Sequence, residues 1–252
     1  MTALVTGAAR RLGREMALEL AARGHDVAIH FHHSAEAAED TARELRAFGV
    51  RAECFGADLL DLDAVEGLLP RVAMAMGPVR VLVNNASIFE ADTIESATHE
   101  SWDMHLGSNL RAPFILSQAF AAQVPVGRDA GPQGLIVNML DQRVLKPTPQ
   151  FMTYSLAKAG LWWLTRTMAQ ALAPAIRVNA IGPGPALQGA RQSEAQFRAQ
   201  QAATLLGHGT DAAEIRHALA YLLEARSVTG QLICADGGQH LGWQTPDTLI
   251  AE

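Results

Sequence analysis

The sequence predicts a single α/β domain in which helices cover both faces of a parallel β-sheet. Short runs of apolar and β-branched residues alternate with longer segments of helical periodicity along most of the chain. This alternation is typical of parallel strands joined by crossover helices. The strand runs are short and continuously apolar, which indicates that both faces of the sheet are buried. The chain has 252 residues, 49% hydrophobic and 18% charged, a composition and length that suit one sizeable core.

The order of these segments defines the expected architecture. We expect strands at residues 3–6, 26–31, 51–55, 79–84, 134–139, 176–181 and 231–234. We expect helices at residues 12–23, 35–48, 62–76, 98–123, 151–172 and 211–224. Right-handed crossovers then arrange the seven strands as a doubly wound, Rossmann-type parallel sheet. Because neither a repeat nor a linker divides the chain, we expect one domain over residues 1–252.

Charge, apolar runs and cysteines argue against several other classes of protein. The net charge is −6 and basic residues are scattered, so nucleic acid is not the expected partner. No apolar run approaches the ~18 residues that span a bilayer, and no basic leader precedes the first apolar segment. Cys54 and Cys234 form no metal-binding spacing. We therefore expect a cytoplasmic protein with reduced thiols, no metal and no membrane segment.

The connection from the first strand to the first helix reads Thr-Gly-Ala-Ala-Arg-Arg-Leu-Gly over residues 6–13. A loop at this place suits a dinucleotide pyrophosphate, because backbone N–H groups and the positive end of the helix dipole face the anion. Gly7 would make the tight turn, and Gly13 would let the helix pack closely on the sheet. An arginine, Arg11, replaces the middle glycine of the usual fingerprint, where its guanidinium would contact phosphate directly. The alternative is an ordinary strand–turn–helix connection. The residues expected to contact the cofactor here are Gly7, Arg10, Arg11, Leu12 and Gly13.

The end of the second strand indicates which dinucleotide binds. A cofactor with a free ribose diol favours Asp or Glu at this place, whereas this chain has His-Phe-His-His-Ser at residues 30–34. A neutral-to-basic pocket of His32, His33 and Ser34, with Arg10 or Arg11 nearby, suits a 2′-phosphate and hence NADPH. A solvated loop is the alternative. A three-histidine metal site is a weaker one, since side chains alternate in direction along a strand and a carboxylate partner is missing.

The most informative stretch is Tyr154-Ser155-Leu156-Ala157-Lys158. Residues four apart share one face of a helix, so the Tyr154 phenol and the Lys158 ammonium point into the same cleft. An adjacent cation stabilises a phenolate and lowers the pKa of the tyrosine. Lysine occurs only twice in the chain, so its retention at position 158 indicates a chemical need that arginine does not meet. The alternative is a surface pair on an amphipathic helix.

Four motifs in this order resemble the short-chain dehydrogenase/reductase family over essentially the whole chain. They are the phosphate loop, Asn84-Asn85-Ala86, the Tyr154/Lys158 pair and Pro183-Gly184. The resemblance implies a nicotinamide cofactor, Tyr154 as proton donor, Lys158 on the nicotinamide ribose, and Asn109 as support for a proton-relay water. It adds further residues beside the cofactor, namely Asp58, Leu59, Asn85, Ala86, Pro183 and Gly184. It also implies a homo-oligomer, and a tetramer is the assembly expected from the family. The segment 183–209 lies beyond the sixth strand, where a segment that covers the substrate belongs.

One residue departs from the family pattern in a way that points to the substrate. Thirteen residues before Tyr154, where most members carry a serine that polarises a carbonyl, this chain has Asp141. A carboxylate would repel a developing alkoxide. A carboxylic acid kept partly protonated by burial would instead deliver a proton to the nitrogen of a C=N bond.

Together with Ala8–Arg14, residues 30–34 and Asn85–Phe89, this replacement resembles the pteridine reductase branch. The resemblance implies that Phe89 sandwiches a flat pterin against the nicotinamide and that Ser87 touches cofactor phosphate or substrate. The alternative for Phe89 is a core aromatic residue. The residues expected to contact the substrate are Ser87, Phe89, Asp141 and Tyr154.

We therefore expect an NADPH-dependent reductase of a dihydropteridine such as dihydrobiopterin, dihydromonapterin or dihydrofolate, with Asp141, Tyr154, Lys158 and Asn109 as its catalytic set. One alternative is a reductase of ketones or sugars in the same family. Another is a dinucleotide-binding sensor without catalysis. The sensor would need the phosphate loop, but it would not need Tyr154, Lys158 and Asn109.

Overall fold

The computed structural model describes residues 1–125, 132–189 and 192–245, and it confirms the expected seven-stranded parallel sheet. The strand order is β3-β2-β1-β4-β5-β6-β7. The strands are β1 (Thr2–Val5), β2 (Asp26–Phe31), β3 (Ala52–Gly56), β4 (Val79–Asn84), β5 (Gly134–Met139), β6 (Ile176–Pro183) and β7 (Leu232–Ala235). Their bounds differ from the expected ones by at most two residues.

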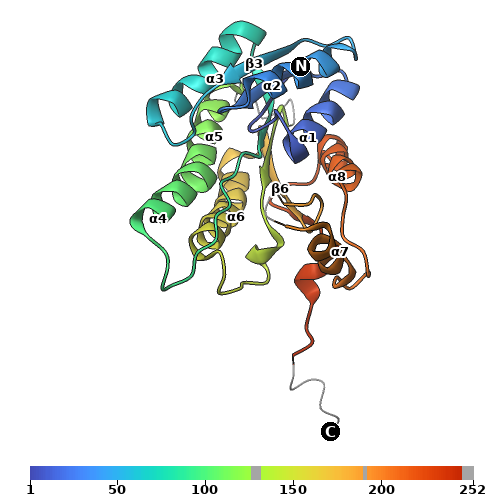
Figure 1. The fold of residues 1–252 in the computed structure, drawn as a ribbon. Coiled ribbons are helices and arrows are strands. Elements are labelled where there is room, and N and C mark those ends of the chain that lie inside the picture. Colours follow the sequence, from blue (N-terminus) through green and yellow to red (C-terminus); the bar gives the residue numbers. More distant parts are fainter. Residues whose placement is uncertain (126–131, 190–191, 246–252) are drawn as a thin grey trace.

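Helices cover both faces of this sheet (Figure 1). One face carries α1 (Arg11–Ala22), α2 (Ala35–Arg46) and α8 (Ala212–Glu224). The other carries α3 (Leu62–Met76), α5 (Ala112–Gln123) and α6 (Met152–Leu172), with α4 (His99–Leu106) packed against α6. Two separate apolar layers result, and the fully buried side chains include Leu4, Ile29, Leu82, Ile136 and Phe120. Burial of such side chains contributes roughly 1.5–3 kcal/mol each, so these layers hold the helices on the sheet.

Two segments differ from the expected elements. The expected helix over 98–123 is interrupted by a π-helical turn, Gly107–Arg111, which joins α4 to α5. The segment 183–209 contains a helix, α7 (Glu194–Ala202), which starts at a capping box formed by Ser193 and Gln196. Hydrophobic periodicity does not reveal α7, because none of its residues is buried.

The sheet places its functional edge at the carboxyl ends of the central strands. β1 and β4 are neighbours although they lie far apart in the sequence, and the chain winds outward from them in opposite directions. Ligands of doubly wound sheets bind in the crevice at such a switch point. The buried amides of Asn84 and Asn138 connect β4 and β5 at 2.8 Å, and Asn138 donates to Thr165 of α6 at 2.9 Å. These bonds fix α6, the helix that carries Tyr154 and Lys158, against the centre of the sheet.

None of the helices in the described part of the chain combines the length and the apolar character needed to cross a bilayer.

Candidate active site

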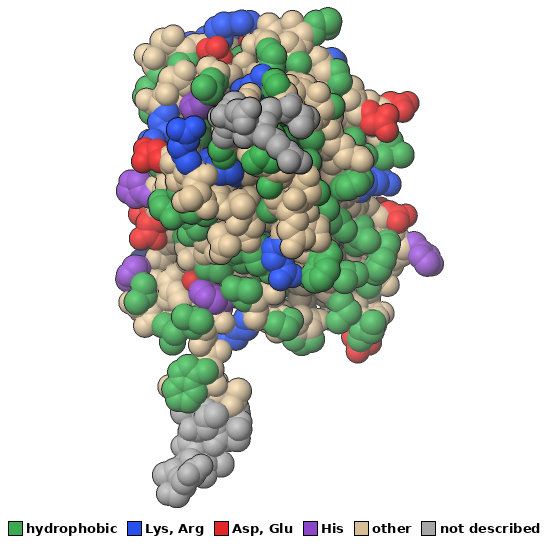
Figure 2. Space-filling view, turned by 180° about the vertical axis from the view of Figure 1, so that it is seen from behind, with side chains coloured by type: hydrophobic (Ala, Val, Ile, Leu, Met, Phe, Trp, Pro, Cys, Tyr) green, Lys and Arg blue, Asp and Glu red, His purple; other side chains and the backbone are tan. Residues whose placement is uncertain are grey.

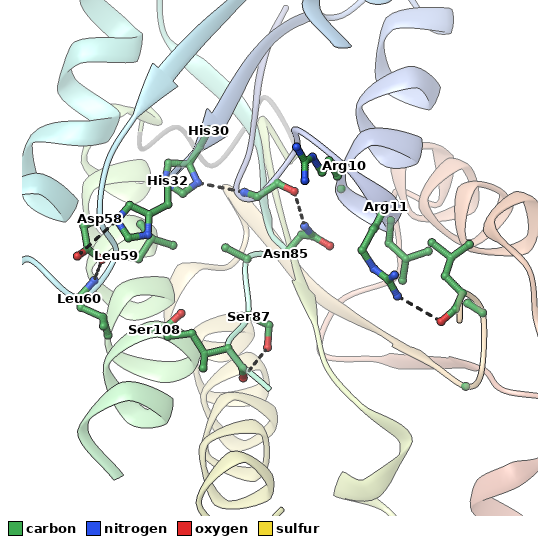
Figure 3. Close-up of a pocket in the computed structure, with 18 residues that line it drawn as sticks. Arg10, Arg11, His30, His32, Asp58, Leu59, Leu60, Asn85, Ser87 and Ser108 are labelled. Atoms are coloured by element: carbon green, nitrogen blue, oxygen red, sulfur yellow. Dashed lines mark hydrogen bonds and ion pairs between the residues drawn. The ribbon is translucent and has the colours of Figure 1, made fainter. Parts of the chain in front are cut away.

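A cavity of about 590 Å³ lies at the carboxyl ends of β1, β2 and β4 (Figure 3). It brings together most of the residues expected at the cofactor: Gly7, Arg10, Arg11, Leu12, Gly13, His32, Asp58, Leu59, Asn85, Ala86, Ser87 and Gly184. His30, Leu60, Ile88, Ser108, Ala186 and Leu187 also line it and were not expected. Its lining does not include four other expected residues, His33, Ser34, Tyr154 and Lys158, and Pro183 lines a neighbouring cavity instead.

The two expected glycines both meet a steric requirement of the phosphate loop. Gly7 has a φ of +64°, a left-handed conformation that glycine adopts without strain. A Cβ atom on Gly13 would lie 2.2 Å from the Gly7 carbonyl oxygen, so α1 packs this closely only with glycine there. Asn85 donates from its amide to the carbonyls of Thr6 (2.8 Å) and Gly7 (3.3 Å), which fixes the loop from the β4 side. The loop at the start of α1 therefore fits the pyrophosphate of a dinucleotide.

Arg11 occupies the middle-glycine position with a glycine-like backbone, at φ +55°. Its guanidinium donates to the carbonyl oxygens of Gln188 at 2.8 Å and Leu187 at 3.2 Å. Both acceptors belong to segment 183–209, and Arg11 lines the cavities on either side of this contact. Arg11 thus connects the phosphate loop to the segment expected to cover the substrate. Its expected contact with phosphate stays a prediction.

His30 is a residue of this site that the sequence did not single out. Gly7 donates its backbone N–H to Nδ1 of His30 at 3.0 Å, and Nε2 lies 3.1 Å from the carbonyl oxygen of Ala57. These contacts require Nδ1 to accept and Nε2 to carry the proton. Burial lowers the pKa of His30 to about 4, so the imidazole is neutral near pH 7. The only sequence signal was its place at the end of β2, beside two exposed histidines.

His32 and Asp58 lie together in the cavity, at the side expected to hold the adenosine of the cofactor (Figure 3). His32 Nε2 lies 3.7 Å from Asp58 Oδ2, and the rings of His32 and His33 are 3.4 Å apart. His30 points instead to Gly7 and Ala57. The three imidazoles therefore do not converge on one point, which argues against the three-histidine metal site.

Tyr154 and Asp141 form a direct contact. The Tyr154 hydroxyl donates to Asp141 Oδ2 at 3.1 Å, and this carboxylate also pairs with the Arg143 guanidinium at 2.9 Å. Arg143 was not expected, because its sequence neighbourhood carries no recognisable motif. Asp141 also accepts from the backbone N–H of Arg143 at 2.9 Å. Asp141 is thus held by three donors rather than isolated among apolar groups.

Lys158 is almost fully buried, with 2% of its surface exposed. Its Nζ donates to the carbonyl oxygen of Met139 at 2.8 Å and lies 5.7 Å from the centre of the Tyr154 ring. Burial lowers the pKa of the Lys158 amine to about 8, although the charge of Asp141 opposes this shift. The expected lowering of the Tyr154 pKa is not found. Burial, together with the Asp141 charge, raises it well above 10. Tyr154 is therefore a protonated phenol at neutral pH.

Asn109 holds the segment that follows β4. It lies in the π-helical turn with a fully buried side chain. Its Oδ1 accepts from the backbone N–H of Ile88 at 2.9 Å, and its Nδ2 donates to the Ile88 carbonyl at 2.8 Å. Asn109 therefore fixes the backbone between Ser87 and Phe89. Its role beside a relay water stays a prediction.

A second cavity of about 860 Å³ adjoins the first and contains the aromatic groups. Phe89 is 39% exposed and lines this cavity, which argues against its alternative as a core residue. Its ring stacks on Phe151 at 4.3 Å and meets the Tyr154 ring edge-on at 4.6 Å. The Arg143 guanidinium lies 5.7 Å and 5.2 Å from the two phenylalanine rings. Phe151 was missed because the sequence predicted only the start of a helix there.

The covering segment contributes a polar wall to the second cavity. Three glutamines spaced four residues apart line it together with Asp141 and Phe89: Gln192, Gln196 and Gln200. Leu187 lines both cavities. Described residues of segment 183–209 thus line both cavities. That the segment covers a substrate stays a prediction.

The fold and this site define a nucleotide-dependent oxidoreductase, and the chain belongs to the short-chain dehydrogenase family. The model of the family described as "short chain dehydrogenase" matches residues 1–199. Among curated relatives, a 3-oxoacyl-[acyl-carrier-protein] reductase FabG of Staphylococcus aureus is 32% identical over 248 residues, covering 95% of this chain and 98% of the relative.

Solved structures include more similar proteins. The FolM alternative dihydrofolate reductase 1 of Brucella canis, complexed with NADP, is 43% identical with a TM-score of 0.92, covering 98% of this chain and 96% of that chain. A short chain dehydrogenase of Burkholderia cenocepacia in complex with NADP is 33% identical with a TM-score of 0.85, covering 94% and 96% of the two chains.

Proposed function

We propose that this protein reduces a dihydropteridine with NADPH. The observation that carries the proposal is the contact of the Tyr154 hydroxyl with Asp141, where most of the family has a serine. An exposed aromatic ring, Phe89, lies against the same tyrosine and suits a flat heteroaromatic substrate. The 43% identity to a FolM dihydrofolate reductase supports the same substrate class.

The cofactor is NADP(H), as in the solved FolM neighbours that bind NADP. Gly7, Gly13 and the start of α1 would hold the pyrophosphate, and Lys158 would approach the nicotinamide ribose. His32, Arg10 and Arg11 line the cavity and would face the 2′-phosphate. When bound, NADPH supplies a hydride to a ring carbon of the substrate.

The chain supplies the matching proton to the ring nitrogen. Tyr154 carries the proton at its hydroxyl oxygen, and Asp141 Oδ2, which accepts the hydrogen bond from that hydroxyl, lies on its path to the substrate. Arg143 holds the carboxylate in one orientation. The Lys158 cation stabilises the phenolate as the proton leaves. Asn109 fixes the backbone at Ile88, next to Phe89, the ring on which the substrate would stack.

A carbonyl reductase is the second candidate function. It is favoured by the FabG relatives at 32% identity, which are described as 3-oxoacyl reductases. Tyr154 and Lys158 serve either chemistry, whereas Asp141 in place of serine disfavours a developing alkoxide. The sensor without catalysis is disfavoured, because dinucleotide binding alone does not need the Tyr154 hydroxyl held against Asp141.

A substrate panel separates the three functions. NADPH oxidation is followed with dihydrobiopterin, dihydromonapterin and dihydrofolate, and in parallel with a set of ketones and sugars. We expect turnover with at least one dihydropteridine and little with the carbonyl compounds. Turnover of carbonyl compounds alone would support the second candidate. Tight NADPH binding without any turnover would support the sensor.

We also propose a cytoplasmic homo-oligomer, a tetramer by resemblance to the family. Hydrophobic side chains gather on the side formed by α4, α5 and α6, to the right in Figure 2. The exposed aromatic residues there include Trp102, Phe114 and Trp163, and they border a groove of about 530 Å³. An apolar surface of this kind is suited to subunit contact. Sedimentation equilibrium measures the number of subunits in the assembly.

The proposed cytoplasmic location is supported by the free thiols of Cys54 and Cys234, which suit a reducing compartment.

A further inference from the structure

A buried chain of polar groups lies behind the active site and includes none of the expected catalytic residues. It consists of His105 on α4, Thr153 in the first turn of α6, and Asp92 in the segment after β4. The exposed fractions of these side chains are 0%, 3% and 5%. Thr153 immediately precedes Tyr154, and the His105 ring meets the Tyr154 ring edge-on at 6.0 Å. This chain of polar groups therefore contacts Tyr154, the residue proposed to donate the proton to the substrate.

The hydrogen bonds that join these polar groups all run in one direction, from donor to acceptor. The backbone N–H of Glu90 donates to Nε2 of His105 at 3.1 Å, so Nε2 must be an unprotonated acceptor. Nδ1 of His105 lies 2.7 Å from Thr153 Oγ1, and in the neutral ring it is the nitrogen that carries the proton. The Thr153 hydroxyl then donates to Asp92 Oδ2. Each group is thus used in a single orientation from Glu90 to Asp92.

The charge states agree with this direction. Burial lowers the pKa of His105, against the charges of Asp92 and Glu90, which keeps the ring neutral near pH 7. Burial alone would raise the pKa of Asp92, but hydrogen bonds from Thr153 and Ser101 more than offset it and lower the pKa overall. The Asp92 carboxylate also accepts the backbone N–H of Thr153 at 3.2 Å, and the Asp92 carbonyl accepts that of Met152 at 3.4 Å. Asp92 thus caps the helix that carries Tyr154.

We propose that the His105–Thr153–Asp92 chain is a positioning device that sets the spacing between the aromatic segment and the catalytic tyrosine. At one end it holds the backbone of Glu90, next to Phe89. At the other it holds the first turn of α6, next to Tyr154. If the bond between His105 and Thr153 were reversed, a neutral His105 ring would carry its proton at Nε2, and two N–H groups would face each other at Glu90 and His105. The device works only with His105 neutral and protonated at Nδ1.

The tautomer of His105 tests the proposal without a substrate. Long-range ¹H–¹⁵N spectra of histidine-labelled protein distinguish Nδ1–H from Nε2–H rings, and the spectrum of a His105→Gln variant identifies which of the nine histidines is His105. We expect the Nδ1–H form at pH 7. An Nε2–H or a charged ring at position 105 would overturn the proposal.

Kinetics test the consequence for the reaction, which rests on the proposed function. Thr153→Val keeps the shape but removes the hydroxyl, so kcat should fall by up to roughly 10²-fold, the effect of a misplacement of about 1 Å. The KM for NADPH should stay unchanged, and Thr153→Ser should restore most of kcat. Thr2→Val is a matched control, because Thr2 is a buried hydroxyl that donates to Met76 at the opposite end of the sheet.

The outcomes separate the two proposals. Wild-type kcat in Thr153→Val, or an equal loss in Thr2→Val, would contradict the positioning role. If the protein reduces only carbonyl compounds, the proposed function fails but the same variants are assayed on those substrates, because Tyr154 serves both reactions. If Thr153→Val does not fold, the tautomer and the Thr153→Ser variant still decide the question.

Discussion

The burial of Lys158 explains why the chain retains a lysine at this position. Its Nζ is buried and donates to the Met139 carbonyl, a contact that suits a compact ammonium group better than a larger, planar guanidinium. We expect Lys158→Arg to lose most of its activity although the charge is kept, by roughly 10²-fold or more in kcat. Initial rates at saturating NADPH measure this. Near-normal turnover would show that charge alone suffices.

The low pKa of Lys158 predicts an alkaline limit to activity. The pKa of about 8 means that the amine is charged below this pH and loses its proton above it. The cation that stabilises the Tyr154 phenolate is then lost, so kcat/KM should fall as the pH rises through about 8. In Lys158→Arg the residual activity should not show this alkaline fall in kcat/KM, because a guanidinium stays charged. A flat wild-type profile between pH ~6 and ~10 would contradict the assignment, since this range spans both protonation states of the amine.

Single residues also show where sequence-based prediction ends. Asp141, Tyr154 and Lys158 were found because each stands at a fixed distance from a recognisable motif. His30 and the His105–Thr153–Asp92 chain were not, because their contacts join segments far apart in the sequence. Arg143 lies only two residues from Asp141, but no motif marks it. The left-handed backbone of Arg11 was also missed, since only the fold reveals its φ.

At the scale of elements, the hydrophobic periodicity of the sequence predicted those helices and strands whose position is set by the burial of an apolar face. The strands of the sheet and helices such as α3 bury one face or both, so their apolar pattern marks their ends closely. The helix α7 is exposed, and capping residues rather than apolar spacing define it. The π-helical turn depends on the packing of Asn109 against Ile88, which no local pattern encodes.

The contact of the phosphate loop with the covering segment leads to a prediction about Arg11. Arg11→Lys keeps the charge and the left-handed strain but loses the forked contact with Leu187 and Gln188. Arg11→Gly loses the contact too but relieves strain on the order of 1 kcal/mol. Both variants should raise the KM for the dihydropteridine, and Arg11→Gly should have the higher Tm. A wild-type KM in Arg11→Lys would assign Arg11 to phosphate binding by charge alone.

The whole molecule is acidic, with a net charge of −6, yet the cavity expected to hold the cofactor carries two arginines, Arg10 and Arg11, against one carboxylate, Asp58. This local excess of positive charge favours a 2′-phosphate. We expect kcat/KM to be at least about tenfold higher with NADPH than with NADH, the effect of one charge-assisted hydrogen bond. The ratio should shrink in high salt, because exposed charges are screened. Equal values of kcat/KM with NADPH and NADH at low salt would contradict the assignment of this cavity to the 2′-phosphate.

The central claim is that Asp141 adapts this family's site to a C=N bond. The most direct test is the ratio of kcat/KM for a dihydropteridine to that for a ketone, measured in the wild type and in Asp141→Ser, with NADPH affinity as the control for folding. Serine is the residue that polarises carbonyls elsewhere in the family. We predict that the ratio falls by roughly 10²–10⁴, the contribution of a positioned proton-transfer group, while NADPH affinity stays the same. An unchanged ratio, with full dihydropteridine turnover in Asp141→Ser, would contradict the account.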